Sequence, residues 1–368
     1  MVIGIDIRWL GFEGSGLYTY LSNLLSTILQ IDRENQYIFF YNKIEERIFA
    51  PQQNLTYKRV KARPFFFKEK FLFYWALKNE DLDLFFEPHF NLPLLLPKNL
   101  PIVLTIHDIT PLALSEFFFL AERAYFWFIL RYAIKRANHI IAVSNYTKES
   151  LKERFPKLNK ISVIYHGTPK LKSEVKRTID ISMPYILYVG NKRRHKNYKR
   201  VIEAYKILKS RLPNYHLLLL GIDGRSSHRI TFLRRVTEGE KVYLYKNASL
   251  FVFPSLSEGF GFPILEAMQF GVPVITSYLS SLPEVAGDAA YFVNPFDVNE
   301  ISEGMYKVLT DENLRKELIK KGIERSNLFS WYETAQKYLK IFQDYRKFTD
   351  HGSLNNFPCI GSLYPRCL

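Results

Sequence analysis

The sequence predicts an α/β protein made of two doubly wound domains in series, facing each other across a cleft. Short apolar runs alternate with amphipathic stretches along most of the 368 residues, which is typical of parallel sheets built from βα units. A chain of this length exceeds one ordinary core, so two domains are expected. A polar stretch at 169–184, bounded by Pro169 and Pro184, interrupts the alternation and is interpreted as the linker.

The first domain is predicted at residues 1–168. A helix is expected at 17–29, because five apolar side chains recur there at helical spacing. The expected strands are 2–8, 37–41, 83–87, 102–106, 139–143 and 161–165.

The second domain is predicted at residues 185–330. Its expected strands are 185–190, 216–220, 230–233, 250–254, 272–276 and 291–293, and its expected helices are 198–211, 238–247, 263–270 and 299–309. Further helix follows from residue 312, and an amphipathic helix at 331–347 is expected to pack back on the first domain. The tail at 348–368 lacks periodicity and is predicted to be poorly ordered.

Composition narrows the class of protein. Hydrophobic residues make up 47% and charged residues 24%, as in ordinary globular proteins. Cys359 and Cys367 alone build neither a disulfide framework nor a zinc site.

The N-terminus is interpreted as an apolar strand rather than a signal peptide. The most apolar stretch, 117–134, is interrupted by charges, so no spanning helix is predicted. The expected location is the cytoplasm, either free or peripheral on the inner face of the membrane.

The segment 252–274, VFPSLSEGFGFPILEAMQFGVPV, predicts a strand, a glycine loop and a helix. Pro263 suits the first helical position and Gly271 the C-terminal stop. The free N–H groups of a helix N-terminus attract anions. Glu258 in the loop and Glu266, expected in the first turn, add two carboxylates suited to the hydroxyl groups of a sugar. The plain alternative is a dipole-stabilised glutamate and a solvated loop glutamate.

EGFGFPILE, followed by EAMQFGVPVI and SLPEVAGDAAYFVNP, resembles the two-glutamate signature of retaining, family-4 nucleotide-sugar glycosyltransferases, which have the GT-B fold of two Rossmann-like domains. The resemblance covers roughly residues 1–345, with its specific motifs in 185–295. It implies that Glu266 binds the ribose hydroxyls and that Glu258 lies by the donor sugar. It also implies that the backbone amides of Gly259, Phe260 and Gly261 lie near the sugar and phosphate.

A basic turn, YVGNKRRHKNYK at 188–199, follows the first strand of the second domain. Cations at a strand end suit a diphosphate, although a solvated basic turn gives the same pattern. The turn resembles the family's Gly…Arg-Lys-Asn segment, which implies that Lys196 stabilises the leaving diphosphate. His195 stands where the family usually has Arg, so either Arg193 or Arg194 is expected to supply the second cation.

Three further segments resemble the same family. His107 in TIHDITPL is expected beside the donor sugar and acceptor, whereas Asp108 is interpreted as structural. Gly16 in GFEGSGLY falls in the loop that closes over the donor phosphates. Arg234 follows a strand where the family commonly has Gly, and it either approaches the nucleotide base or points to solvent.

Two segments, 58–78 and 117–136, interleave aromatic with basic residues. They suit either an anionic membrane surface or core helices with snorkelling cations at their margins. The net charge of +15 attracts polyanions, anionic lipids and phosphorylated metabolites alike. Since no recognition motif accompanies it, no nucleic-acid partner is expected.

The predicted function is transfer of a hexose, with mannose favoured by analogy, from a nucleotide sugar to a saccharide or lipid-linked acceptor with retention of configuration. The setting implied by the resemblance is surface polysaccharide synthesis. Neither a cofactor nor a metal is expected, because cations take the place of a metal. The alternative is a catalytically inactive transferase-like binding or scaffold subunit. A nicotinamide oxidoreductase is disfavoured, because the dinucleotide glycine fingerprint is absent.

Overall fold

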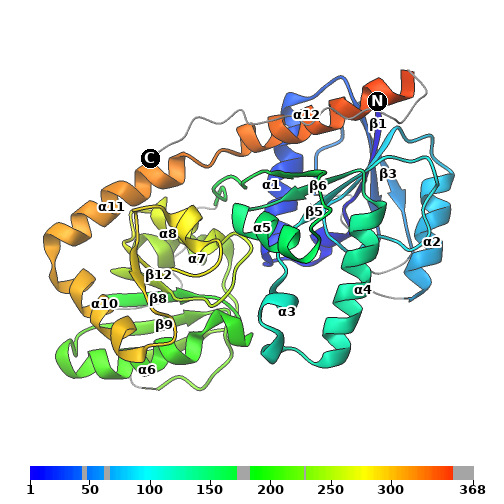
Figure 1. Cartoon of the computed structure of the whole chain (residues 1–368). Coiled ribbons are helices and arrows are strands. Elements are labelled where there is room, and N and C mark those ends of the chain that lie inside the picture. The colour runs from blue at the N-terminus through cyan, green and yellow to red at the C-terminus, as the bar shows by residue number, and fades with distance from the viewer. Residues whose placement is uncertain (44–47, 62–66, 172–182, 228, 351–368) are drawn as a thin grey trace.

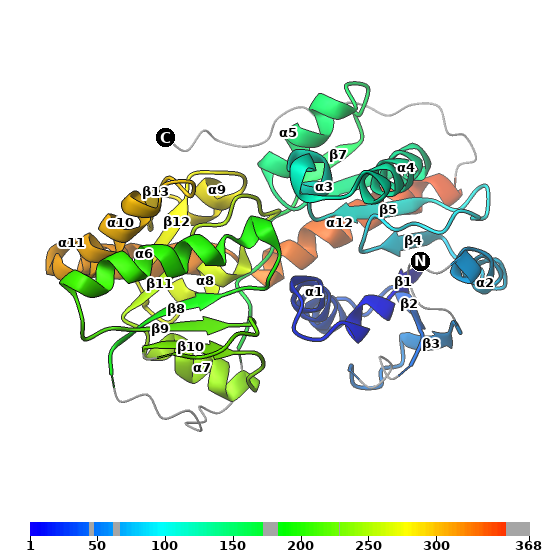
Figure 2. The same cartoon turned by 90° about the horizontal axis from the view of Figure 1, so that it is seen from below.

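Two parallel β-sheets divide the chain into two lobes that lie side by side (Figures 1 and 2). The computed structural model describes residues 1–43, 48–61, 67–171, 183–227 and 229–350. The predicted α/β class with two doubly wound sheets is confirmed. Most of the expected linker and tail, residues 172–182 and 351–368, lies outside the described residues.

The first lobe contains a seven-stranded sheet in the order β3-β2-β1-β4-β5-β6-β7. Its strands are β1 Val2–Asp6, β2 Gln36–Tyr41, β3 Leu55–Arg59, β4 Leu84–Glu87, β5 Ile102–Ile106, β6 His139–Ala142 and β7 Ile161–Val163. Its helices are α1 Gly16–Ile31, α2 Phe67–Lys78, α3 Thr110–Ala113, α4 Leu120–Arg136 and α5 Asn145–Arg154, with short 3₁₀ turns at Arg8–Gly11 and Ser115–Phe117.

The second lobe contains a six-stranded sheet in the order β10-β9-β8-β11-β12-β13. Its strands are β8 Tyr185–Val189, β9 His216–Leu220, β10 Ile230–Leu233, β11 Leu250–Phe253, β12 Val274–Ser277 and β13 Tyr291–Val293. Its helices are α6 Tyr198–Arg211, α7 Glu238–Lys246, α8 Phe262–Met268, α9 Leu282–Ala286, α10 Val298–Thr310 and α11 Glu312–Asn327, with a 3₁₀ turn at Arg194–Lys196.

The edge strand β3 and the helices α3, α5 and α9 were not anticipated from the sequence. In β3 only Leu55 is buried and the remaining side chains are exposed or half-buried. An edge strand pairs on one side only, so it does not need the continuous apolar run that marks a buried parallel strand. The segment LTYKR therefore lacks the signal that identified the inner strands.

The last helix, α12 Trp331–Asp350, leaves the second lobe and packs on the first (Figure 1). Trp331, Tyr338 and Phe342 belong to the same hydrophobic cluster as β1 and α1. The hydroxyl of Tyr338 lies 2.9 Å from that of Tyr20 and 3.0 Å from that of Thr105. This buried group ties α12 to α1 and β5, and so the helix fastens the two lobes together.

In both sheets the chain first adds strands outward in one direction from a central strand and then reverses, adding the remaining strands on its other side. The reversal falls between β1 and β4 in the first sheet and between β8 and β11 in the second. Ligands of such sheets bind beyond the carboxyl ends of the strands at this point. The segments that follow these four strands are therefore the place to look for a site.

Within the described residues, no helix combines the length and the apolar character needed to cross a membrane.

Candidate active site

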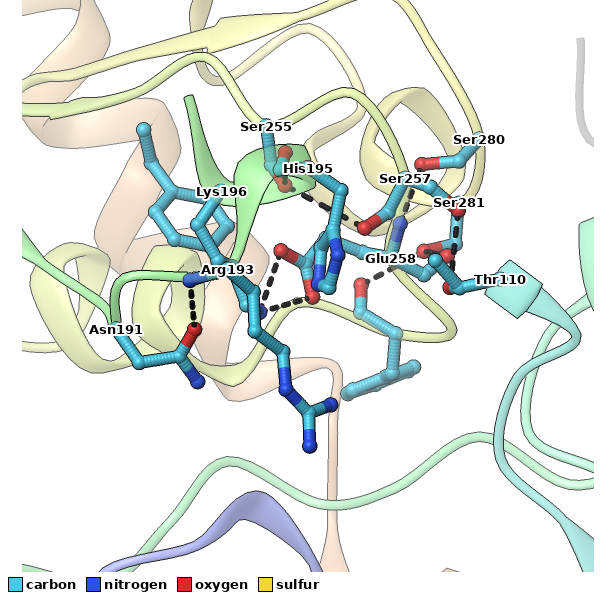
Figure 3. Close-up of polar contacts among 12 residues, drawn as sticks. Thr110, Asn191, Arg193, His195, Lys196, Ser255, Ser257, Glu258, Ser280 and Ser281 are labelled. Atoms are coloured by element: carbon cyan, nitrogen blue, oxygen red, sulfur yellow. Dashed lines mark hydrogen bonds and ion pairs between the residues drawn. The ribbon is translucent and has the colours of Figure 1, made fainter. Parts of the chain in front are cut away.

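A lysine and a glutamate meet at the reversal point of the second sheet (Figure 3). Lys196 lies in the turn after β8 and Glu258 in the loop after β11. The ammonium of Lys196 donates to both carboxylate oxygens of Glu258, each at 2.7 Å. Their side chains are only 17% and 11% exposed. Two residues that are 62 positions apart in the sequence thus form one ion pair. The pair lies at the strand ends where a ligand is expected.

Serine side chains hold the loop that carries Glu258. The amide N–H of Glu258 donates to the hydroxyl of Ser280 at 3.0 Å. The hydroxyl of Ser281 donates to the carbonyl oxygens of Glu258 and Phe260 at 3.0 and 3.1 Å. Ser255 donates to the carbonyl of His195 at 2.9 Å, which links the loop to the basic turn. Sequence reasoning missed these residues, because single serines in loops carry no pattern.

The basic turn is held by Asn197 and His195. Asn197 has a φ of +61° and donates through its side chain to the carbonyls of Pro254 and Pro295 at 2.9 and 2.7 Å. His195 is buried, and burial lowers its pKa to about 4, with Lys196 adding to the effect. A neutral, buried His195 leaves Lys196 as the cation that the turn presents to Glu258.

Glu266 lies one residue deeper in its helix than the sequence predicted. Gly261, with a φ of +105°, is the N-cap of α8, and the helix begins at Phe262. Glu266 is therefore one residue beyond the first turn. Its carboxylate accepts hydrogen bonds from side chains instead of from the free amides at the helix N-terminus. Lys241 and Tyr245 of α7 donate to its two oxygens at 2.7 and 2.8 Å. Each carboxylate oxygen has two lone pairs, so this buried group can still accept from a ligand.

His107 lies at the end of β5, where the sequence predicted it. Its Nε2 lies 2.9 Å from the carbonyl oxygen of Pro88. A carbonyl only accepts, so Nε2 carries the proton and Nδ1 is left as an acceptor in the neutral ring. Burial lowers the pKa of His107 to about 4. This histidine is thus suited to receiving a hydrogen bond from a hydroxyl group and is a weak proton acceptor near neutral pH.

The two lobes touch at the glycine loop. A Cβ added to Gly259 would lie 1.8 Å from the carbonyl oxygen of His107. The hydroxyls of Thr110 and Ser257 lie 3.2 Å apart across the same boundary. Gly16 of the first lobe faces the ring of Phe262, to which an added Cβ would come within 3.7 Å. His107, Gly16 and the Glu258 loop therefore share one region between the lobes.

The side chain of Phe260 is buried in a hydrophobic cluster. Its ring lies 4.9 Å from that of His166 and 5.7 Å from that of Phe329. The phenyl ring therefore packs between the lobes, and only its backbone remains open to the donor role that the resemblance implies. His166, which follows β7 and stacks on Phe262 at 5.1 Å, was not singled out from the sequence.

The other predicted cations are exposed. Arg193 and Arg194 are both solvent-accessible, and Figure 3 shows the guanidinium of Arg193 extending away from the Lys196–Glu258 pair. Arg234 is 74% exposed and lies 3.1 Å from Asp223 in an ion pair. Among the described residues, no group of three or more His, Cys, Asp or Glu side chains could hold a metal ion.

Glu284 joins the lobes at a second place, also missed by sequence reasoning. This residue of α9 accepts from the amides of Asn145 and Tyr146, both at 2.9 Å. It also accepts from the hydroxyl of Tyr165 at 3.0 Å. A carboxylate of the second lobe thus caps the N-terminus of α5 in the first lobe, where it is favoured by the helix dipole.

Comparison with known proteins places this geometry in a family. Residues 172–325 match the model of the glycosyl transferases group 1, and residues 37–170 match that of glycosyltransferase family 4. The chain is 31% identical over 294 residues to the O-antigen chain mannosyltransferase B of Escherichia coli, covering 73% of this chain and 76% of the relative. It is 27% identical over 321 residues to the O-antigen chain mannosyltransferase RfbU of Salmonella typhimurium, covering 80% and 87%.

A solved structure shares the fold. The structure of Alr3699/HepE from Anabaena in complex with UDP-glucose superposes with a TM-score of 0.71 at 15% identity, covering 94% of this chain and 100% of that chain. The two family models together match most of the chain, and the relative at 31% identity spans 73% of it. The chain therefore belongs to glycosyltransferase family 4 and is a glycosyltransferase of the GT-B fold.

Proposed function

We propose that this enzyme transfers mannose from a nucleotide-activated donor to a saccharide or lipid-linked saccharide in surface polysaccharide synthesis, with retention of configuration. The Lys196–Glu258 pair at the reversal point of the second sheet carries the proposal. The choice of mannose rests on two relatives that are named as O-antigen chain mannosyltransferases. The fold shared with a protein solved with UDP-glucose supports a nucleotide-sugar donor.

In the proposed complex, the donor lies over the carboxyl ends of β8 and β11. The ammonium of Lys196 faces the diphosphate, and the carboxylate of Glu258 accepts from a hydroxyl group of the sugar. Glu266 accepts from the ribose hydroxyls through the lone pairs that Lys241 and Tyr245 leave free. Binding of the donor therefore needs little rearrangement, because the hydrogen bonds within the protein already orient both carboxylates.

Transfer breaks the bond between the anomeric carbon and the diphosphate oxygen, and forms a bond from that carbon to the acceptor oxygen. Lys196 stabilises the negative charge that develops on the leaving diphosphate, with Arg193 or Arg194 as the second cation. The acceptor attacks from the face that the diphosphate leaves, and its hydroxyl proton passes to the departing phosphate. Because side-chain cations take this role, we propose that no metal is required, so that a chelator leaves the rate unchanged.

The first lobe is proposed to hold the acceptor. The neutral ring of His107 receives a hydrogen bond at Nδ1 from a hydroxyl of the donor sugar or of the acceptor. The contact between Gly259 and the His107 carbonyl region brings this ring beside the Glu258 loop. Contact between the two lobes around the donor excludes water, which would otherwise hydrolyse the donor.

A thermal-shift screen against GDP-, UDP- and ADP-sugars tests the donor, because a ligand that binds only the folded state raises the unfolding temperature. The stabilising sugar is then used to measure release of the nucleotide by mass spectrometry, and NMR of the product gives its anomeric configuration. GDP-mannose is expected to stabilise the protein, and Glu266→Ala to weaken that effect. Stabilisation without any release of nucleotide would favour the alternative, an inactive binding subunit.

A further inference from the structure

Two helices of the first lobe expose an unusual set of aromatic side chains. Phe119 and Leu120, at the start of α4, are 79% and 77% exposed. Isolated exposed apolar residues are common, whereas a concentration of them marks an interaction site. We call the set the α2/α4 surface. Its members are Phe71, Leu72 and Trp75 of α2, with Phe119, Leu120, Tyr125, Trp127 and Phe128 at α4.

Both helices lie on the same side of the first sheet. The buried faces of α2 and α4 belong to one hydrophobic cluster, in which Phe73 and Leu77 of α2 join Phe126 and Leu130 of α4. The opposite side of the sheet is occupied by α1 and α12. Figure 2 shows α2 and α4 on one face of the first sheet and α1 on the other. Their exposed faces therefore point away from the same side of the sheet.

The loop between β4 and β5 packs against α4. The hydroxyl of Tyr132 in α4 donates to the carbonyls of Pro93 and Leu94 at 3.0 and 2.6 Å. The next residue, Leu95, is 43% exposed. An apolar side chain of this loop thus adds to the α2/α4 surface beside α4.

Basic residues lie on the same exposed faces. Arg131 and Lys135 are exposed in α4, and their spacing from Leu120 and Phe128 puts them on one stripe of the helix. From residue 120 to 136 the chain has four basic residues and one acidic residue, Glu122. Glu122 accepts from the amide of Phe119 at 3.0 Å as a helix cap. The charge of the stripe is therefore positive.

We propose that the α2/α4 surface docks on an anionic lipid bilayer. Phenylalanine and leucine side chains enter the acyl boundary, tryptophan and tyrosine remain near the headgroups, and arginine and lysine reach anionic lipid phosphates. The ammonium of Lys78 already lies 5.1 Å from the ring of Trp75, so that one cation and one interfacial aromatic act together. A protein partner matched only to apolar side chains would not account for the basic stripe.

The proposed bilayer contact is continuous with the acceptor side of the site. Thr110, which contacts Ser257 of the other lobe at 3.2 Å, begins α3, and the chain runs from there directly into Phe119 and α4. An acceptor carried on a lipid would then be presented beside the lobe that contains His107. The docking itself does not depend on the proposed donor or reaction, and so it can be tested without either.

Co-sedimentation with vesicles tests the docking. The full chain is expected to sediment with phosphatidylcholine vesicles that contain phosphatidylglycerol, and less with phosphatidylcholine alone. Phe119→Ser with Leu120→Ser is expected to lower the partition coefficient about tenfold or more. The matched control is Leu328→Ser with Tyr332→Ser, two side chains 66% and 53% exposed near the start of α12, which should sediment like the wild type.

The charge contribution is tested separately. Arg131→Ser with Lys135→Ser is expected to remove most of the preference for phosphatidylglycerol, and added salt should weaken wild-type binding in the same way. Intrinsic fluorescence gives a second measurement on the unaltered protein. Of the four tryptophans, Trp75 and Trp127 are exposed on this surface, whereas Trp9 and Trp331 are each 2% exposed. Anionic vesicles should therefore shift the emission to shorter wavelength.

Three outcomes would overturn the proposal. One is wild-type protein that neither sediments with anionic vesicles nor changes its emission. Another is equal loss of binding in the α2/α4 variant and in the control variant. The last is a lipid-free dimer that Phe119→Ser with Leu120→Ser converts to monomer, since the surface would then be an interface between copies of this chain. Loss of glycosyl transfer with vesicle binding intact would count against the proposed function alone.

Discussion

At the scale of single residues, the ion pair between Lys196 and Glu258 orients both groups before a donor binds. The pair is largely buried, so each charge depends on the other for compensation. His195 cannot replace Lys196, because its pKa is lowered to about 4 and its ring is neutral near pH 7. The same two side chains therefore contribute to stability and, in the proposed mechanism, to catalysis.

These two contributions can be separated by a double-mutant cycle. Lys196→Ala leaves the carboxylate of Glu258 uncompensated, and we expect it to lower the free energy of unfolding by about 3 kcal/mol. Glu258→Ala should cost a similar amount, and the double variant should cost clearly less than the sum. Urea unfolding gives these values.

Turnover should follow a different pattern in the same variants. Lys196→Ala is expected to lower kcat by about 100-fold or more, the usual cost of removing one stabilising donor from a developing anion, and the double variant should not recover it. Turnover at the wild-type rate in the Lys196 variant would contradict the leaving-group role.

Gly259 gives a second residue-scale prediction, because a methyl group there would meet the carbonyl of His107. Its φ is not positive, so alanine is compatible with the backbone itself. Because the added methyl group would meet backbone atoms, Gly259→Ala should keep the lobes apart and lower the unfolding temperature moderately. A misplacement of this kind costs about 100-fold in kcat/KM. Steady-state kinetics and thermal unfolding measure the two effects, and normal kcat/KM would show that the contact is unimportant.

What the sequence predicted at this scale depended on whether a residue belonged to a motif. Lys196 and Glu258 were both selected for the donor site, and the structure joins them at 2.7 Å. Glu266 was placed one helical position too early, because the positive φ of Gly261 that starts the helix at Phe262 is not visible in a list of residues. Ser280 and Glu284 were missed, since their partners lie far away in the chain.

At the scale of elements, apolar runs predicted the inner strands and the apolar edge strand β10 well, but missed the polar edge strand β3. Five of the six strands expected in the second sheet start and end within one residue of the observed ones, and α6 has the predicted bounds. β3 has one buried side chain and therefore no apolar run. The contact of Glu284 with α5 likewise joins two helices in different lobes. Local sequence patterns do not predict such a contact.

That contact yields an element-scale prediction. Glu284→Ala removes a carboxylate that accepts from two amides of α5 and from Tyr165. Hydrogen bonds to a charged group contribute about 1.5–3 kcal/mol each, so the closed arrangement should be weakened and kcat/KM should fall about tenfold or more. Small-angle scattering should show a larger radius of gyration for this variant.

Ser144→Ala is the matched control for that experiment. The hydroxyl of Ser144 accepts from the amide of Thr147 at 3.1 Å and caps α5 within its own lobe. Its loss should cost about 1 kcal/mol of stability and leave the radius of gyration unchanged. If both variants give the same scattering profile as the wild type, Glu284 does not hold the lobes together.

At the scale of the whole molecule, two buried and two half-buried histidines link stability to pH. Burial lowers the pKa of His107, His139 and His195 to about 4 each, and that of His166 well below its usual value. In the unfolded chain these rings titrate near 6.5. Between pH 6.5 and about 4 the unfolded state therefore binds more protons than the folded state, so acidification through this window favours unfolding.

The enzyme should accordingly lose stability as the pH falls from about 6.5 towards 4, by at most about 1.4 kcal/mol per pH unit for each histidine. His139 offers a test away from the site, because it lies in β6 with its Nε2 3.0 Å from the hydroxyl of Ser162. His139→Asn should reduce the slope of unfolding free energy against pH. Urea unfolding between pH 7.5 and 5 measures that slope. A wild-type protein whose unfolding free energy stays constant across this range would show that its histidines are not held neutral by the fold.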